Sequence, residues 1–244
     1  RMRLGVAERI DMDGRVVIPL DENSLRAAAG KLKQQGVEAI GVCFLFSFIN
    51  PVHELRAREI IAEELPGVHV SLSHEVLPKV REFERFSTTM LNAYLTPRYE
   101  LYLDELLQKL RSLGLPSHLF VMLSNGGMMP GDAAKWRGVE GILSGPSGGI
   151  SAAISTGARL GENHLITADM GGTSYDVCVV VNKAPEISDQ YWINRHLVAL
   201  PMLDIHTIGA GGGSIAYVDK GGALRVGPES AGADPGPACF GKGG

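Results

Sequence analysis

The 244-residue sequence has few cysteines, few aromatic residues and no long apolar run. Its three cysteines, Cys43, Cys178 and Cys239, are odd in number and far apart, which argues against a disulfide framework and against a cysteine zinc site. The longest apolar run, residues 39–49, is too short to cross a membrane as a helix. Because this run is rich in strand-forming residues, it predicts a buried strand, and we expect no membrane association.

The sequence also lacks an excess of positive charge. It has 23 basic and 27 acidic residues, a net charge of −4 and a pI near 6.0, so nothing electrostatic favours nucleic acid as a partner. No export signal opens the chain, and we expect a globular cytoplasmic protein. The first residue is not methionine and the last ones are glycines, so we expect a piece of a longer protein whose own N-terminus would carry any such signal.

Helices and strands alternate in the first part of the chain. Apolar positions at helical spacing predict helices over residues 25–35 and 51–65, and short apolar runs predict strands at residues 39–49 and 68–73. This order indicates crossover units on a largely parallel sheet, hence an α/β fold.

A change in composition follows the next predicted helices. Residues 87–89 are expected to cap one helix, and Pro97 to start or kink a long helix over residues 98–113. Beyond these helices, glycines cluster in turns. We therefore place a domain boundary near residue 95, giving domains 1–95 and 96–244.

The most informative stretch is a pair of apolar strands over residues 165–181 with a polar, glycine-rich turn between them. Without side chains at Gly171 and Gly172, backbone amides can approach an anion closely, and Thr173 and Ser174 add hydroxyl donors. This arrangement favours a phosphate ligand, although an ordinary hairpin with a polar turn is the simpler alternative.

Two carboxylates flank that turn. The Asp169 carboxylate would repel a bare phosphate, but a divalent cation between the carboxylate and the phosphate would attract both. Mg²⁺ suits this place, because it takes only one or two carboxylates in proteins. We predict Asp169 as the metal ligand, with Asp176 second.

A second glycine-rich loop, with Gly211, Gly212 and Gly213, is expected to pack against a nucleotide. It matches a dinucleotide fingerprint poorly, because Ser214 replaces the final glycine. Asp204 and His206 lie two apart, hence on one face of an extended segment, where they are candidates for metal or acid–base work or simply for a structural role.

Four further polar residues are candidates for a substrate site or cleft. Ser124 and Asn125 end a strand and either bind a ligand or form the turn. Arg81 and Arg85 belong to a charge cluster that is either solvated or placed at a cleft, and we predict both to be at least partly buried in ion pairs with carboxylates.

These motifs together resemble the hydantoinase A / 5-oxoprolinase / acetone carboxylase family. The hardest to obtain by chance is Pro-Gly-Pro-Ala-Cys at residues 235–239. The resemblance rests on residues 81–89, 92–95, 124–127, 144–149, 169–176, 208–216 and 227–241.

The resemblance implies an actin-like ATPase fold, related to ribonuclease H, with mixed sheets, flanking helices and two lobes that hold ATP and Mg²⁺ between paired phosphate hairpins. The hairpin at residues 169–176 resembles the second of these, and the first has no counterpart here, so the fold is incomplete. We therefore expect the chain alone to be inactive and to bind ATP no more tightly than roughly millimolar.

For the intact protein the resemblance implies ATP-dependent opening of a cyclic amide such as a hydantoin or 5-oxoproline, together with a hydantoinase B-type partner subunit or domain. No residue of the sequence identifies the catalytic base. Two alternatives remain open at this point: an ATP-dependent ketone carboxylase subunit, and a non-catalytic actin-like ATP-binding module.

Overall fold

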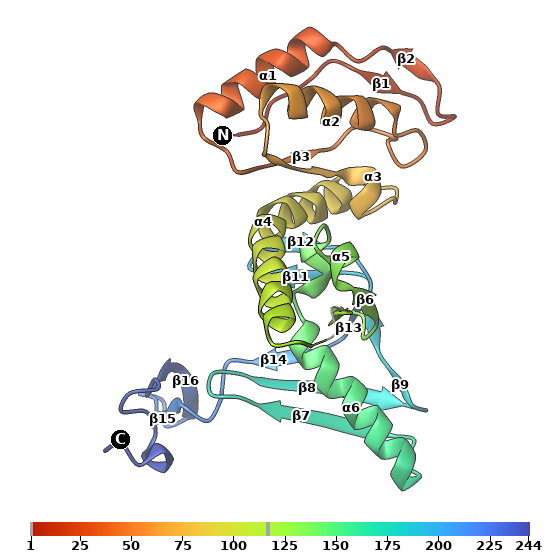
Figure 1. Ribbon diagram of the computed structural model, residues 1–244. Coiled ribbons are helices and arrows are strands. Elements are labelled where there is room, and N and C mark those ends of the chain that lie inside the picture. Colours follow the sequence, from red (N-terminus) through yellow and green to blue (C-terminus); the bar gives the residue numbers. More distant parts are fainter. Residues whose placement is uncertain (1, 116–117) are drawn as a thin grey trace. The chain divides into compact units, whose positions relative to one another are not determined.

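The computed structural model describes residues 2–115 and 118–244. These residues form two compact units (Figure 1). Unit 1 runs to Ile142 and includes Asp189–Met202, and unit 2 comprises Leu143–Ser188 and Leu203–Gly244. Both units contain helices and strands, which confirms a mixed α/β protein.

The helices are α1 (Glu22–Gln34), α2 (Val52–Glu64), α3 (Ser73–Val76), α4 (Glu82–Ser112), α5 (Gly131–Ala134) and α6 (Ser144–Leu160), with 3-10 turns η1 (Gly138–Gly141) and η2 (Ala238–Phe240). The strands are β1 (Arg9–Ile10), β2 (Val16–Ile18), β3 (Ala39–Val42), β4 (His69–Leu72), β5 (Phe120–Met122), β6 (Met128–Pro130), β7 (Leu165–Met170), β8 (Tyr175–Val181), β9 (Ala184–Pro185), β10 (Ile187–Ser188), β11 (Tyr191–Ile193), β12 (His196–Val198), β13 (Met202–Leu203), β14 (His206–Ile208), β15 (Ser214–Val218) and β16 (Leu224–Ser230).

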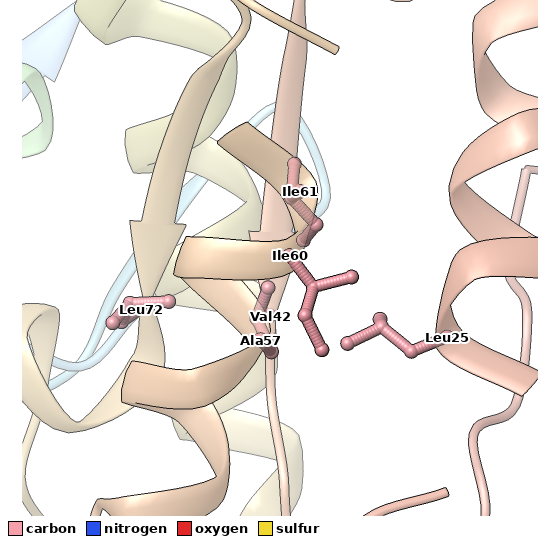
Figure 2. Packing of buried hydrophobic residues seen from close by; sticks show 6 residues of the cluster. All are labelled: Leu25, Val42, Ala57, Ile60, Ile61 and Leu72. Atoms are coloured by element: carbon pink, nitrogen blue, oxygen red, sulfur yellow. The ribbon is translucent and has the colours of Figure 1, made fainter. Parts of the chain in front are cut away.

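The predicted crossover in unit 1 is confirmed. Strands β3 and β4 pair in parallel with Ala39 opposite His69, and α2 connects them. Helix α1 begins where the Asp21 carboxylate accepts the amides of Asn23 and Ser24. Its Leu25 points toward Ile60 of α2 in a core that α1, α2, β3 and β4 share (Figure 2). Burial of these apolar faces holds the helices against the strands.

The strand predicted over residues 39–49 is wrong beyond Val42. The Phe44 amide donates to the buried carboxylate of Glu54 at 2.9 Å, and Phe46 has a φ of 55°. A strand cannot continue through a left-handed residue, so the chain turns before α2. Cys43 consequently lies just outside β3, half-buried, whereas Cys178 is buried within β8 and Cys239 is exposed.

Helix α4 is continuous through both positions where the sequence predicted a helix start. Thr88 and Thr89 are inside it, where their hydroxyls donate to the carbonyls of Glu84 and Arg85, and Pro97 is also internal. Ser87 and Thr88 also accept the amides of Leu197 and Ala199, at the β11–β12 hairpin. Tertiary contacts therefore replace the predicted caps. The predicted boundary near residue 95 falls inside α4 and does not divide the compact units.

Unit 2 is built on an antiparallel sheet with the strand order β14-β8-β7 and with β9 also beside β8. Helix α6 packs on β7 and β8, as Figure 1 shows. Its Ile150 joins Cys178, Val180, Leu203 and Ile205 in the core. The hairpin predicted for this region is confirmed.

Candidate functional site

The turn between β7 and β8 offers three backbone donors. The Gly171 amide donates to the Ser174 carbonyl at 3.0 Å and closes the turn. The amides of Gly172, Thr173 and Ser174 find no acceptor among the residues that the structure describes. Successive free amides in a turn form a concave, positively polarised surface that suits an anion.

Two carboxylates stand at the base of this turn. Asp169 and Asp176 are direct cross-strand partners, so both side chains lie on the same face of the sheet. They line a cavity of about 410 Å³ whose other wall comes from α6, including Gly149 and Ile150. The Asp169 Oδ2 atom lies 3.9 Å from the position that a Cβ on Gly149 would occupy, so glycine keeps the space beside this carboxylate open.

This donor set fits Mg²⁺. In the described part of the chain no three acidic, histidine or cysteine side chains cluster as a metal site. Mg²⁺ does not require such a cluster, because it keeps several waters and takes one or two carboxylates together with phosphate oxygens. Asp169 and Asp176 are the residues that would hold it. Two facing carboxylates repel each other, and a cation would relieve that repulsion.

Thr207 of β14 lies beside Asp176, on the same face of the sheet as Asp169 and Asp176. It is the cross-strand partner of Asp176, and its Oγ1 donates to Asp176 Oδ1 at 2.6 Å. The sequence predicted no role for Thr207, and no local signal marks it, because only the pairing of β14 with β8 brings it to Asp176.

The loop containing Gly211, Gly212 and Gly213 packs against the β7–β8 turn. It does not add a second surface of free amides beside that turn. The amides of Gly212 and Gly213 donate to the carbonyls of Gly171 and Gly172, each at 2.9 Å, and that of Gly211 donates to Ser214 Oγ. These three amides are therefore engaged within the protein, and the expectation that this loop packs against a nucleotide stays a prediction. These hydrogen bonds brace the turn from one side.

Close backbone approach explains the glycines of this bracing loop. A Cβ on Gly211 would lie 2.5 Å from the Thr173 nitrogen and 2.6 Å from the Gly172 carbonyl carbon. No side chain fits at that distance, so glycine at position 211 allows the bracing loop to pack against the β7–β8 turn.

Asp204 and His206 do not join this arrangement. Within β14 the side chain of His206 alternates to the opposite face from Thr207. Asp204 precedes the strand, is exposed, and does not line the cavity with Asp169. Their positions give no support to the predicted role of Asp204 and His206 in metal binding or acid–base chemistry.

The two arginines differ sharply. Arg85 is fully buried and donates to Ser73 Oγ, the Lys79 carbonyl and the Phe44 carbonyl at 3.2, 3.0 and 2.7 Å. Its predicted carboxylate partner is wrong, because backbone and hydroxyl oxygens take its donors and Glu54 reaches it only through Ser73. The Arg81 side chain is 70% exposed, 3.5 Å from Glu84. Both belong to unit 1, where Arg85 is an internal cross-link.

Ser124 and Asn125 shape the β5–β6 turn in unit 1. Ser124 is buried and its Oγ donates to the Glu140 carbonyl at 2.7 Å, while Asn125 Oδ1 accepts the Gly127 amide at 2.8 Å. Of the two interpretations, turn formation accounts for these contacts. Both residues also line a small cavity of about 160 Å³.

A larger cavity of about 620 Å³ in unit 1 contains none of the predicted site residues. Its charged lining side chains pair with one another, Arg58 with Glu75 and Arg137 with Glu140. Asn92 closes one wall through hydrogen bonds with Ser71, Trp136 and Val139. These groups are paired within the protein, and of the polar lining atoms the buried Nδ1 of His69 has no partner among the described residues. The β7–β8 turn, with three free amides, is the better candidate for anion chemistry. None of the helices in the described ranges has the length and apolar character needed to span a membrane.

Comparison with known protein families accounts for most of the chain. Residues 85–244 match the family described as hydantoinase/oxoprolinase, and residues 1–65 match the hydantoinase/oxoprolinase N-terminal region.

Individual relatives are similar over nearly the whole chain. The caprolactamase subunit alpha of Pseudomonas jessenii is 40% identical over 243 residues, covering 100% of this chain and 35% of the relative. The 5-oxoprolinase of Saccharomyces cerevisiae is 41% identical over 231 residues, covering 94% of this chain and 18% of the relative. The chain thus spans about a third or less of the length of these relatives.

Two solved structures have the same fold over this region. The crystal structure of the ATP-dependent caprolactamase from Pseudomonas jessenii superposes with a TM-score of 0.82 at 40% identity, covering 98% of this chain and 35% of that one. The nucleotide-free acetone carboxylase, described with ATP-dependent acetone carboxylation, gives a TM-score of 0.81 at 33% identity, covering 93% and 32%. Sequence and structure agree that this chain belongs to the hydantoinase/oxoprolinase family, whose relatives include ATP-dependent enzymes.

Proposed function

We propose that the intact protein uses Mg²⁺ and ATP to open a cyclic amide, and that the β7–β8 turn holds the nucleotide phosphates. The observation that carries this proposal is the set of free amides at Gly172, Thr173 and Ser174 in the turn that joins the strands bearing the facing carboxylates of Asp169 and Asp176. Amide donors and a carboxylate-bound cation are the two kinds of group that neutralise phosphate charge in phosphoryl transfer.

The chemistry requires activation of an unreactive carbonyl. Resonance weakens a ring amide as an electrophile. Transfer of the terminal phosphate of ATP to the amide oxygen releases ADP and makes that oxygen a leaving group. Water then adds at the carbon and the ring C–N bond breaks, with the nitrogen taking up a proton, which leaves an acyl phosphate. A second water releases phosphate from this acyl phosphate and gives an open-chain amino acid. In this scheme the three amides orient the phosphate and Asp169 holds the cation, with Asp176 beside it.

Relatives supply the substrate class. Caprolactamase and 5-oxoprolinase are named for cyclic amides, and both are about 40% identical to this chain. We also propose an actin-like fold for the intact protein, in which a second phosphate hairpin, outside this chain, faces the β7–β8 turn. We further propose that two family domains meet near residue 95. The caprolactamase relative is a subunit of a larger enzyme, which supports a hydantoinase B-type partner as the source of the catalytic base.

A ketone carboxylase is the second candidate. Its support is the structural match to acetone carboxylase, whose TM-score of 0.81 is close to that of caprolactamase. Both chemistries need the same phosphate and cation groups, so the residues of the turn are common to them.

Substrate-dependent ATP turnover separates these functions. Phosphate release by the intact protein with its partner would be measured with Mg²⁺ and ATP alone, with caprolactam, 5-oxoproline or hydantoin, and with acetone plus bicarbonate. Stimulation by a cyclic amide is the expected result. Stimulation only by ketone plus bicarbonate would establish the carboxylase, and nucleotide binding without stimulated turnover would indicate a non-catalytic ATP-binding module.

A further inference from the structure

One row of side chains crosses three strands of unit 2. Asp169 on β7 is opposite Asp176 on β8, and Asp176 is opposite Thr207 on β14. Direct cross-strand partners project to the same face of a sheet, so the three side chains form a continuous line. The alternation of β14 sends His206 and Ile208 to the other face.

The hydrogen bond within this row is short and directional. Thr207 Oγ1 donates to Asp176 Oδ1 at 2.6 Å, within the range for a hydroxyl bonded to a charged carboxylate. Threonine in a strand has a restricted χ1 angle, so its hydroxyl is held in place by the backbone of β14. The bond therefore fixes how the Asp176 carboxyl plane is turned.

The contrast with Asp169 is informative. The Asp169 carboxylate accepts no hydrogen bond from the residues that the structure describes, although it lines the cavity beside α6. Of the two facing carboxylates, one is held by a neighbouring strand and the other is left for a ligand. The hydroxyl also places a positive dipole next to a pair of like charges, which lowers the repulsion between them.

We propose that Thr207 is a positioning residue that orients Asp176 toward the divalent cation of the nucleotide site. This inference rests on the proposed function, because it assumes that Asp169 and Asp176 hold the cation. Groups that orient a metal ligand typically change metal affinity by 10- to 100-fold when they are removed. Thr207 would act in this way on Asp176, without touching cation or phosphate itself.

The test uses Mn²⁺ as a probe on the intact protein, with free Mn²⁺ measured by electron paramagnetic resonance in the presence of ATP. Thr207→Val keeps the shape and the branched Cβ but removes the hydroxyl, and should raise the Kd for Mn²⁺ by about 10-fold. Thr207→Ser retains the hydroxyl and should bind within about 3-fold of the unaltered protein, since only a methyl group is lost. Thr207→Ala provides a second hydroxyl-free variant if the valine variant does not fold.

The outcomes distinguish this inference from the proposed function. If folded Thr207→Val or Thr207→Ala binds Mn²⁺ as tightly as the unaltered protein, the positioning role is overturned. If Thr207→Ser is as weak as Thr207→Val, the methyl group rather than the hydrogen bond matters, and the inference is again overturned. If Asp169→Asn and Asp176→Asn both leave Mn²⁺ binding unchanged, the proposed cation site itself fails.

Discussion

Asp169 on β7 and Asp176 on β8 lie directly opposite each other across the hairpin, on the face of the sheet that α6 covers. Like charges in this relation destabilise a sheet by a fraction of a kcal/mol to about 1 kcal/mol. The cavity and the turn of free amides beside this pair support the proposed binding of a cation together with its anion.

Asp169→Asn should therefore impair function without impairing the fold. The amide is isosteric and removes the repulsion, so the thermal midpoint of the intact protein should be unchanged or higher. ATP turnover should fall by about 10²-fold or more, as expected when one preorganised electrostatic element is lost. Steady-state phosphate release and a thermal unfolding curve measure the two effects. Asp204→Asn, which alters an exposed carboxylate that does not line the cavity, is the matched control. Near-normal turnover of Asp169→Asn would remove this residue from the metal site.

The bracing loop gives a prediction with a control only two residues away. Gly211→Ala would place a Cβ 2.5 Å from the Thr173 nitrogen, whereas Gly209→Ala meets nothing within 4 Å. Because the clash is with backbone, the turn must move, and nucleotide binding should weaken by about 10-fold or more even though Gly211 contributes no free amide. Isothermal titration with Mg²⁺ and ATP on both variants of the intact protein measures this. Equal affinities would show that the loop does not control the shape of the turn.

Arg85 should be important for stability and Arg81 should not. Arg85→Ala would leave the buried carbonyls of Phe44 and Lys79 without their donor. Each such loss costs about 1–3 kcal/mol, so the free energy of unfolding should fall by about 3 kcal/mol or more. Arg81→Ala removes only an exposed ion pair and should change the free energy of unfolding by less than about 0.5 kcal/mol. Urea unfolding of both variants tests the contrast. Similar small effects would mean that the internal cross-link is dispensable.

Glu54 predicts a loss of stability in acid. Burial alone raises the pKa of its carboxyl, but hydrogen bonds from His74, Ser73 and the Phe44 amide outweigh burial and hold the pKa below its ordinary value of 4.5. A lowered pKa in the folded state means that the ionised carboxylate stabilises the protein above pH 4.5. That contribution disappears as the pH falls through the lower, folded-state pKa.

Urea unfolding between about pH 7 and about pH 3 should show this loss. Glu54→Gln should lower the free energy of unfolding near neutral pH and make it fall less steeply with pH on the acid side. Glu105→Gln, an exposed change on α4, should leave the pH profile unaltered. An acid limb that is as steep in Glu54→Gln as in the unaltered protein would assign the pH dependence to other carboxylates.

The local elements and the motif of the proposed site could be predicted from the sequence. Apolar positions at helical spacing predicted α1 and α2, and apolar runs around a glycine-rich turn predicted the β7–β8 hairpin with Asp169 and Asp176 at its base. These features depend on residues close together in the chain, so they are visible without the fold.

How distant segments meet could be learned only from the folded chain. It made α4 one continuous helix, because Ser87 and Thr88 dock a hairpin more than a hundred residues later. It gave Arg85 carbonyl partners instead of carboxylates, because the end of β3 brings the Phe44 carbonyl to its guanidinium. It turned the glycines at 211–213 into a brace and brought Thr207 to Asp176, because hydrogen bonds and cross-strand register join groups that sequence spacing does not relate.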